Sequence, residues 1–310
     1  MKFDYQWVKD PECFEINREK AHSDHSYYAS SQEMLMDESS FKQSLNGVWK
    51  FHYAKNYKET IRDFEQKDYD CKDWDNIKVP GHIQMQGYDK PMYVNQMYPW
   101  SGREGIKPGE IPEHFNPVGS YVKYFSVPEK MKGQKLYICF HGVETAFALW
   151  LNGEFVGYSE DSFTPSTFFL SPYLEEGENK LAVQVFKYSS GSWLEDQDFW
   201  RFSGIFRDVE LCSIPTTHVK DLFIKTVMEE PFDKANIEME LKIKGKIEHC
   251  LIQSELLDPD GTEVLKQNFK ITEKNPLLSI PVESPLLWSA EYPHLYTLIL
   301  TVLYKDEVKE

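Results

Sequence analysis

Three carboxylates lie between two tryptophans in the stretch GSWLEDQDFWRFSGIFRDVEL. They are Glu195, Asp196 and Asp198, and two arginines follow them at Arg201 and Arg207. An ionised carboxylate is costly to desolvate beside aromatic rings unless a cation or hydrogen-bond donors compensate it. One interpretation is a structural ion-pair network with the two arginines. The other is a carboxylate that faces a wet pocket, where it binds a hard cation or accepts hydrogen bonds from substrate hydroxyls. Spacing alone leaves both open.

The geometry of this acidic stretch depends on whether it is extended. In an extended strand, Asp196, Asp198 and Trp200 would share one face because side chains alternate along the strand. Glu195 and Arg201 would then point to the opposite face. Two carboxylates would lie beside one indole.

A second candidate is the segment VPGHIQMQGYDKPMYVNQMYPW, which combines glycine, prolines and aromatics with an amide at Asn95. The pattern predicts a loop after a short strand. In such a loop Asn95 either caps a turn or offers an amide donor and acceptor to a sugar hydroxyl. His82 and His114 have no partner at a metal-ligand spacing, which favours structural roles. The sequence has no Ser/His/Asp nucleophile motif, P-loop or dinucleotide fingerprint.

Charge and cysteine content narrow the class of protein. The 310 residues contain 50 Asp and Glu against 34 Lys and Arg, a formal charge of −16, which argues against nucleic acid and anionic membrane as partners. Five scattered cysteines without ligand spacing indicate reduced thiols. The N-terminus has no apolar leader and no segment is long enough for a membrane span, so we expect a cytoplasmic protein. The 15% aromatic content suits a β-rich core or rings that line a sugar site.

The apolar pattern predicts an all-β protein with an N-terminal arm. Residues 1–42 have no sustained period and need another surface to be ordered. Between residues 43 and 214, runs of five to nine residues alternate in the manner of strands, and Asn152-Gly153 is a strong hairpin signal because a type I′ turn needs two positive φ angles. Helix is scarce, with residues 57–68 as the best candidate.

A second domain is expected from residue 217 to residue 310. There the aromatic-rich strands give way to charged, alternating ones, which predict a smaller β-sandwich of immunoglobulin-like size. The last strand pattern, HLYTLILTVLYKDEVKE, stops soon after a turn begins. We therefore expect this sandwich to be truncated at its C-terminal end.

Together these segments resemble the N-terminal part of the bacterial β-galactosidases of glycoside hydrolase family 2. The opening is similar to the family signature of Trp7, Pro11, Asn17, Arg18 and His22. The segments VPGHIQMQGYDKPMYVNQMYP, FNPVGSYVKYFSVPE, FHGVETAFALWLNGEFVGYSEDSF, GSWLEDQDFWRFSGIFRDVEL and LWSAEYPHLYTL follow in the family's order. The resemblance spans essentially the whole chain.

The resemblance implies a jelly-roll, galactose-binding-like β-sandwich followed by an immunoglobulin-like β-sandwich. In the family a (β/α)8 barrel comes next and carries the two catalytic glutamates and the Mg2+ ligands. This chain has no Asn-Glu pair of the acid/base type and no strand-helix alternation that would build a barrel. We therefore expect no catalytic residue in these 310 residues and no activity from them alone.

The resemblance also implies roles for individual residues. Asn95 and Asp198 match the positions that the first domain contributes to the galactose subsite, and Asp198 would additionally bind a sodium ion that offsets its desolvation. Glu195 and Asp196 would pair with arginines or brace the loop. The implied partners are a β-galactoside substrate, the chain's own missing catalytic barrel, and further copies of the full-length protein in a homo-oligomer. Alternatives are a free-standing carbohydrate-binding module, a scaffold protein, or a related β-glucuronidase or β-mannosidase.

Overall fold

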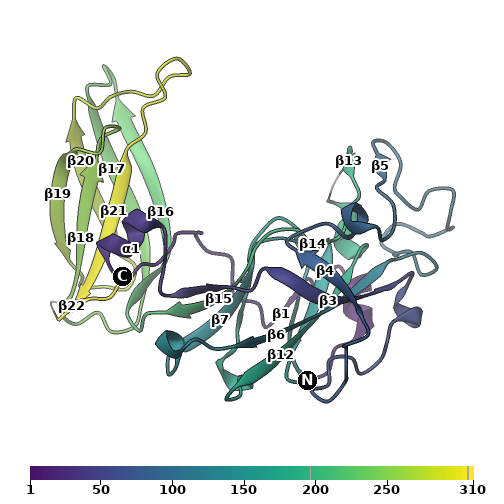
Figure 1. Ribbon diagram of the computed structural model, residues 1–310. Helices are drawn as coiled ribbons and strands as arrows, with labels where there is room; N and C mark the ends of the chain where they lie inside the picture. Colours follow the sequence, from purple (N-terminus) through teal and green to yellow (C-terminus); the bar gives the residue numbers. More distant parts are fainter. Residues whose placement is uncertain (196, 306) are drawn as a thin grey trace. The chain divides into compact units, whose positions relative to one another are not determined.

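Two structural units make up the chain. The computed structural model describes residues 1–195, 197–305 and 307–310. Unit 1 comprises Met1–Ala21 and Lys42–Ser213, and unit 2 comprises His22–Phe41 and Ile214–Glu310. The predicted arm is thus divided between the units (Figure 1).

Unit 1 is a β-sandwich of one large and one small sheet. The seven-stranded sheet has the order β1 (Glu15–Ile16), β10 (Glu154–Ser159), β9 (Ala146–Leu151), β12 (Glu178–Phe186), β6 (Val118–Ser126), β3 (Gly47–Ala54) and β4 (Asp75–Val79). The four-stranded sheet has the order β11 (Ser166–Phe169), β7 (Lys135–Phe140), β15 (Val209–Ile214) and β2 (Lys42–Ser44). Two short ladders pair β13 (Phe199–Trp200) with β5 (Tyr93–Val94) and β14 (Gly204–Ile205) with β8 (Val143–Glu144).

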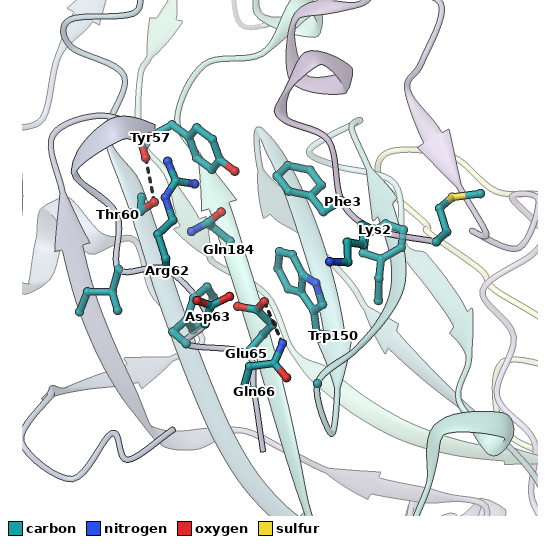
Figure 2. Close-up of a pocket in the computed structure, with 15 residues that line it drawn as sticks. Lys2, Phe3, Tyr57, Thr60, Arg62, Asp63, Glu65, Gln66, Trp150 and Gln184 are labelled. Atoms are coloured by element: carbon teal, nitrogen blue, oxygen red, sulfur yellow. Dashed lines mark hydrogen bonds between the residues drawn. The ribbon is translucent and has the colours of Figure 1, made fainter. Parts of the chain in front are cut away.

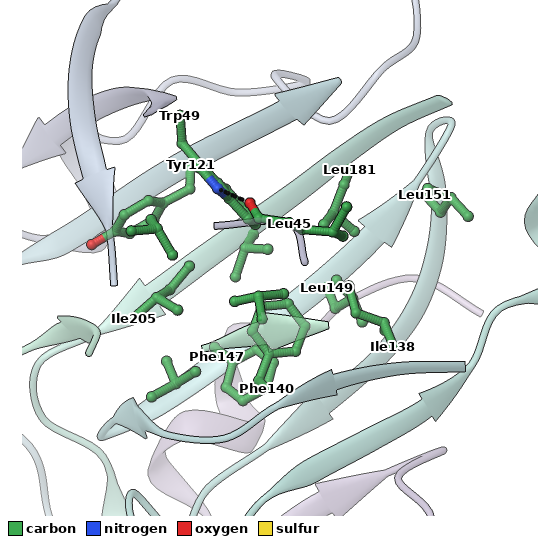
Figure 3. Packing of buried hydrophobic residues seen from close by; sticks show 14 of the residues in the cluster. Leu45, Trp49, Tyr121, Ile138, Phe140, Phe147, Leu149, Leu151, Leu181 and Ile205 are labelled. Atoms are coloured by element: carbon green, nitrogen blue, oxygen red, sulfur yellow. Dashed lines mark hydrogen bonds between the residues drawn. The ribbon is translucent and has the colours of Figure 1, made fainter. Parts of the chain in front are cut away.

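The main core of unit 1 consists of buried apolar side chains from both sheets (Figure 3). Alternation sets which side chains enter it, because successive residues of a strand point to opposite faces. Leu149 and Leu151 of β9 point into this core, whereas Trp150 between them belongs to a separate cluster on the other face. The buried Trp49 indole donates a hydrogen bond of 2.8 Å to the Leu45 carbonyl, so its polar atom is satisfied.

The second face of the seven-stranded sheet is covered by segments without regular strands. They include the 3-10 helix η1 (Tyr5–Lys9) and residues 57–74. The helix predicted for residues 57–68 is wrong: only the 3-10 turn η2 (Tyr57–Glu59) forms, followed by an extended residue and a left-handed one at Asp63, φ 57°. The segment breaks helical geometry, and Phe64 is buried against the sheet.

The remaining short helices of unit 1 lie in connections. These 3-10 turns are η3 (Ile83–Gln86), η4 (Glu129–Met131), η5 (Ser171–Tyr173) and η6 (Ser190–Trp193). All five cysteines of the chain are free thiols, as predicted.

Unit 2 is the immunoglobulin-like sandwich together with the second part of the arm. Its three-stranded sheet has the order β16 (His218–Glu229), β17 (Lys234–Lys244) and β20 (Leu277–Glu283). Its four-stranded sheet has the order β19 (Glu263–Lys270), β18 (Cys250–Leu257), β21 (Thr297–Tyr304) and β22 (Glu307–Val308). The arm contributes α1 (Ser31–Met36), whose first turn is capped by the Ser30 hydroxyl. In the described ranges no helix has the length and apolarity needed to cross a membrane.

Candidate functional site

The two predicted site residues come from segments that pair with each other. Strands β5 and β13 are antiparallel, with Val94 opposite Phe199 and Tyr93 opposite Trp200. Asn95 directly follows β5 and Asp198 directly precedes β13, so both lie just beyond the paired positions. The β5–β13 ladder projects from one end of unit 1 (Figure 1).

Asp198 lies on the surface and not in a dry interior. Its side chain is exposed, its backbone is left-handed with φ 56°, and one carboxylate oxygen accepts a hydrogen bond from the Tyr93 hydroxyl. That hydrogen bond raises the pKa of Tyr93, because it stabilises the protonated hydroxyl. Within the described residues Asp198 forms no ion pair, so the arginine network proposed from spacing does not include it.

Asn95 is also exposed. Its side-chain oxygen accepts a hydrogen bond of 2.8 Å from the backbone N–H of Gln96, so the amide stabilises its own bend. The NH2 group of Asn95 remains available as a donor. Turn capping and ligand binding, offered as alternatives from the sequence, are compatible here.

Exposed aromatic rings follow Asp198 in the sequence. Phe199 and Trp200 are about half exposed. The Trp200 ring stacks on Phe202 at 5.9 Å and meets Tyr93 at 5.7 Å, and Phe199 meets Phe163 edge-on at 6.3 Å. Exposed flat rings beside a carboxylate and an amide suit the apolar face and the hydroxyls of a sugar.

The loop before Asp198 turns, so the strand geometry considered for the acidic stretch applies only to Phe199 and Trp200. Glu195 braces this loop: its carboxylate accepts from the Ser162 N–H at 3.0 Å and the Ser162 hydroxyl at 2.9 Å. Arg201 is buried and donates to the Glu195 carbonyl at 3.0 Å. Asp196 lies outside the described residues.

A buried carboxylate anchors the turn that leads into this loop. Glu160, 5% exposed, accepts hydrogen bonds from the hydroxyls of Tyr158, Ser189 and Ser190 and from the Gly191 N–H. Burial raises the pKa of Glu160, and these donors oppose that shift. The turn η6 is therefore fixed at its base.

A second buried group ties the two site segments together. Gln84 donates to the Ser203 hydroxyl at 2.9 Å and to Asp89 at 3.0 Å, and its oxygen accepts from the Ser203 N–H. Asp89 also pairs with Lys187, whose side chain is 1% exposed. Burial lowers the pKa of Lys187, while the Asp89 carboxylate counteracts this. These contacts connect Gln84 and Asp89 with Ser203, which lies between β13 and β14.

His82 lies between two aromatic rings and not in a metal site. Phe202 stacks on it at 4.6 Å and Phe206 at 5.1 Å. Burial lowers the pKa of His82, and a Glu144 oxygen lies 3.6 Å from Nδ1. The sequence could not indicate this neighbour, because the two residues are far apart in the chain.

The structure offers part of a cation site at most. One oxygen of Asp198 receives no hydrogen bond from the described residues, and a hard carboxylate oxygen of this kind fits as one ligand of sodium. No group of three or more His, Cys, Asp or Glu side chains in the described part of the chain could hold a metal ion.

The fold is that of two β-sandwiches, the first with exposed aromatic rings, a carboxylate and an amide on the segments around β5 and β13. The comparisons with known proteins are specific. Residues 42–215 match the sugar binding domain of glycosyl hydrolases family 2, and residues 217–310 match a second model of glycosyl hydrolases family 2. The chain belongs to this family.

Curated relatives share high identity along almost the whole chain. A β-galactosidase of Halalkalibacterium halodurans is 53% identical over 95% of this chain and 29% of the relative. A β-galactosidase of Clostridium acetobutylicum is 49% identical over 97% of this chain and 33% of the relative. The chain thus spans about a third of the length of these relatives.

Solved structures support the fold. A β-glycosidase from Bacteroides vulgatus superposes with a TM-score of 0.66 at 24% identity, covering 86% of this chain and 32% of that one. A Bacteroides uniformis β-glucuronidase gives 0.66 at 22% identity, with 86% and 31% covered. At this identity the likeness speaks for the fold alone.

Proposed function

We propose that this chain is the part of a β-galactosidase that supplies Asn95 and Asp198 to the galactose subsite. The observation that carries the proposal is the β5–β13 ladder, which brings the segment of Asn95 beside the segment of Asp198, with the Tyr93 hydroxyl donating to the Asp198 carboxylate. The identity to curated β-galactosidases supports the choice of substrate. The longer protein would hydrolyse terminal β-galactosides with retention, using two closely spaced carboxyl groups that these 310 residues do not contain.

Asp198 has two tasks in this proposal. Its free oxygen would ligate sodium, and the carboxylate would accept hydrogen bonds from galactose hydroxyls. Asn95 would donate from its NH2 group. The other ligands of the sodium ion would come from a barrel outside this chain. Mg2+ would bind to residues of that barrel. The longer protein would assemble as a homo-oligomer. A relative from Lactobacillus helveticus, 39% identical, is named a β-galactosidase large subunit, which supports assembly from several subunits but not their identity.

The test is Asp198→Asn in the longer protein that contains this chain. We expect kcat/KM for o-nitrophenyl β-D-galactopyranoside to fall at least tenfold, about 1.4 kcal/mol, and the response of the rate to sodium to disappear. The neighbouring exposed Gln197→Ala is the matched control and should keep both. An unchanged rate in Asp198→Asn would make Asp198 a structural residue.

The rival functions predict different binding. A free-standing carbohydrate-binding module would bind galactose at micromolar affinity, whereas a chain with one wall of a subsite should reach no better than about the millimolar level, roughly 4 kcal/mol. Calorimetry on the 310-residue chain separates the two. A β-glucuronidase or β-mannosidase would instead be indicated if the longer protein preferred the corresponding nitrophenyl glycosides over the galactoside.

A further inference from the structure

A series of aromatic rings connects the two residues of β13 with the body of unit 1. Each ring contacts the next, and the series begins at one β13 residue and returns to the other. The rings, in order, are Trp200, Phe202, His82, Phe206, Phe163 and Phe199. We call this series the ring belt. Both residues of β13 are therefore held through rings that meet at His82.

His82 makes the closest ring contacts in the belt. Its ring stacks on Phe202 at 4.6 Å and on Phe206 at 5.1 Å, with interplanar angles of 27° and 11°. The other three centroid separations in the belt are 5.7, 5.9 and 6.3 Å. Stacked rings at such distances attract each other, so His82 fixes the position of one phenyl ring relative to the other.

Backbone hydrogen bonds on both sides of His82 hold it in place. The Gly81 N–H donates to the Ile205 carbonyl at 2.8 Å, and the Ile83 N–H donates to the Ser203 carbonyl at 3.0 Å. The two phenylalanines that stack on His82 flank this paired stretch in the sequence. The central ring of the belt is therefore attached to a fixed backbone.

An arginine holds the other half of the belt. The Arg207 guanidinium lies 5.3 Å from the centroid of the Phe206 ring and 5.7 Å from that of Phe163. It also donates a hydrogen bond of 3.0 Å to the Phe163 carbonyl. A cation over an aromatic ring is attracted to it, so Arg207 keeps Phe163 beside Phe206. Phe163 in turn meets Phe199 edge-on.

The β13 strand needs this support because its own pairing is short. β5 and β13 pair over two residues each, and Phe199 and Trp200 are about half exposed. A two-stranded ladder alone is marginally stable in water. Asp198 directly precedes Phe199, so the direction of its carboxylate depends on how the belt holds β13.

His82 acts in the belt as a flat ring and not as a charge. Burial lowers its pKa, so the imidazole is mostly neutral at pH 7. We propose that His82 is a positioning residue, which fixes the direction of the Asp198 side chain through the ring belt. This role rests on the proposed function of Asp198 in the galactose subsite.

Fluorine NMR on the 310-residue chain labelled with 5-fluorotryptophan tests the physical part of the proposal. The signals of Trp200 and Trp150 are assigned by their loss in Trp200→Phe and Trp150→Phe. We expect His82→Leu, which removes the flat ring, to shift and broaden the Trp200 signal. His82→Phe keeps a ring and should leave that signal in place, as should the matched control His114→Leu at an exposed histidine.

Trp150 provides the internal reference for these spectra. It lies beside Phe3 in a separate cluster on the second face of the seven-stranded sheet (Figure 2). Its signal should stay in place in every His82 variant. A shift of both signals would indicate a general disturbance of unit 1 and would contradict a specific role of His82.

Kinetics of the longer protein test the link to Asp198. We expect kcat/KM for o-nitrophenyl β-D-galactopyranoside to fall about fivefold in His82→Leu and to stay within about twofold of wild type in His82→Phe and His114→Leu. In an Asp198→Ala background His82→Leu should have no further effect, because the carboxylate that the belt positions is absent. A residue with a merely structural role would lower the rate in both backgrounds.

Several results would overturn the proposal. One is a Trp200 signal that does not move in His82→Leu. Another is an equal effect of His82→Phe and His82→Leu, which would assign the role to the imidazole nitrogens and not to the ring. Additive losses with Asp198→Ala would mean that His82 acts on a different part of the enzyme.

Two further measurements keep the test decisive. If His82→Leu does not fold, Phe163→Leu at a 40% exposed position breaks the belt on its other side. It should also shift the Trp200 signal, and no shift would equally refute the belt. An unchanged rate in Asp198→Ala would refute the proposed function instead, and the NMR spectra would still decide whether His82 positions β13.

Discussion

The Tyr93 hydroxyl donates a hydrogen bond to the Asp198 carboxylate across the β5–β13 ladder. This contact joins two loops separated by 105 residues. It leaves one carboxylate oxygen and the Asn95 NH2 group for a ligand or a cation. The hydrogen bond therefore holds the Asp198 carboxylate in one orientation.

Tyr93→Phe tests this orienting role. The substitution keeps the ring contact with Trp200 but removes the hydroxyl that donates to Asp198. In the longer protein we expect kcat/KM for a β-galactoside to fall about fivefold, less than for Asp198→Asn. Because Tyr93 would act only through the Asp198 side chain, Tyr93→Phe should have no further effect in an Asp198→Ala background, which leaves no acceptor for its hydroxyl. Additive losses would contradict the proposed coupling.

The 310-residue chain should not hydrolyse a β-galactoside. The described residues form two β-sandwiches and an arm without a strand-helix alternation, and the retaining reaction needs a proton donor and a nucleophile close together. We expect no turnover of o-nitrophenyl β-D-galactopyranoside above the buffer rate at micromolar protein. Robust turnover by chain free of contaminating enzyme would refute the assignment.

Much of the fold was predictable because its signals are local. Asn152 and Gly153 have φ angles of 52° and 89°, the two positive values that the hairpin pattern required, and β9 and β10 flank them. Apolar alternation likewise predicted the strands. The helix prediction for residues 57–68 was wrong because the spacing of their apolar residues resembles that of a helix. In the structure Phe64 packs on the sheet, and the local sequence does not specify that contact.

The candidate site was predictable in its residue types but not in its geometry. Carboxylate, amide and aromatic residues in loops indicated sugar chemistry, and the resemblance selected Asn95 and Asp198. Tyr93 was missed, although it lies two residues before Asn95, because its relation to Asp198 depends on strand register. His82 and Glu144 were missed as neighbours for the same reason. Long-range pairing is a property of the folded sheet.

The Lys187–Asp89 pair should be important for the stability of unit 1. Both side chains are almost fully buried, at 1% and 5% exposure. Removing one charge leaves the other desolvated and unpaired, so we expect Lys187→Met to lower the free energy of unfolding by about 3–5 kcal/mol. Tryptophan fluorescence during urea denaturation measures the unfolding mainly of unit 1, because unit 1 contains all tryptophans except Trp288.

The double variant Lys187→Met/Asp89→Asn is the control for that prediction. It removes both charges, keeps at position 89 a residue type that tolerates the left-handed backbone there, φ 57°, and should recover part of the lost stability. If the double variant were as unstable as Lys187→Met alone, the packing of the lysine stem and not its charge would explain the loss.

His141 should make the stability of unit 1 depend on pH. Its interactions with the Cys139 side chain and with the Glu210 carboxylate, 3.0 Å from Nε2, raise the pKa of His141 to about 10. Lys42 also faces Glu210, at 3.3 Å. A raised histidine pKa stabilises the fold fully below the unfolded value near 6.5, and this contribution is lost as the pH rises through about 10. His141 is one-third exposed, so we expect no more than about 1 kcal/mol.

Urea denaturation of wild type and His141→Gln across the pH range measures this contribution. The difference in unfolding free energy should be largest at pH 6 and should shrink steadily toward pH 10, because the imidazolium alone supplies it. Glu210→Gln removes the negative charge beside the imidazole without removing the histidine and should flatten the same profile in part, since Cys139 remains. Parallel pH profiles for wild type and His141→Gln would mean that the His141 imidazole is neutral in the folded protein and contributes to stability only through packing.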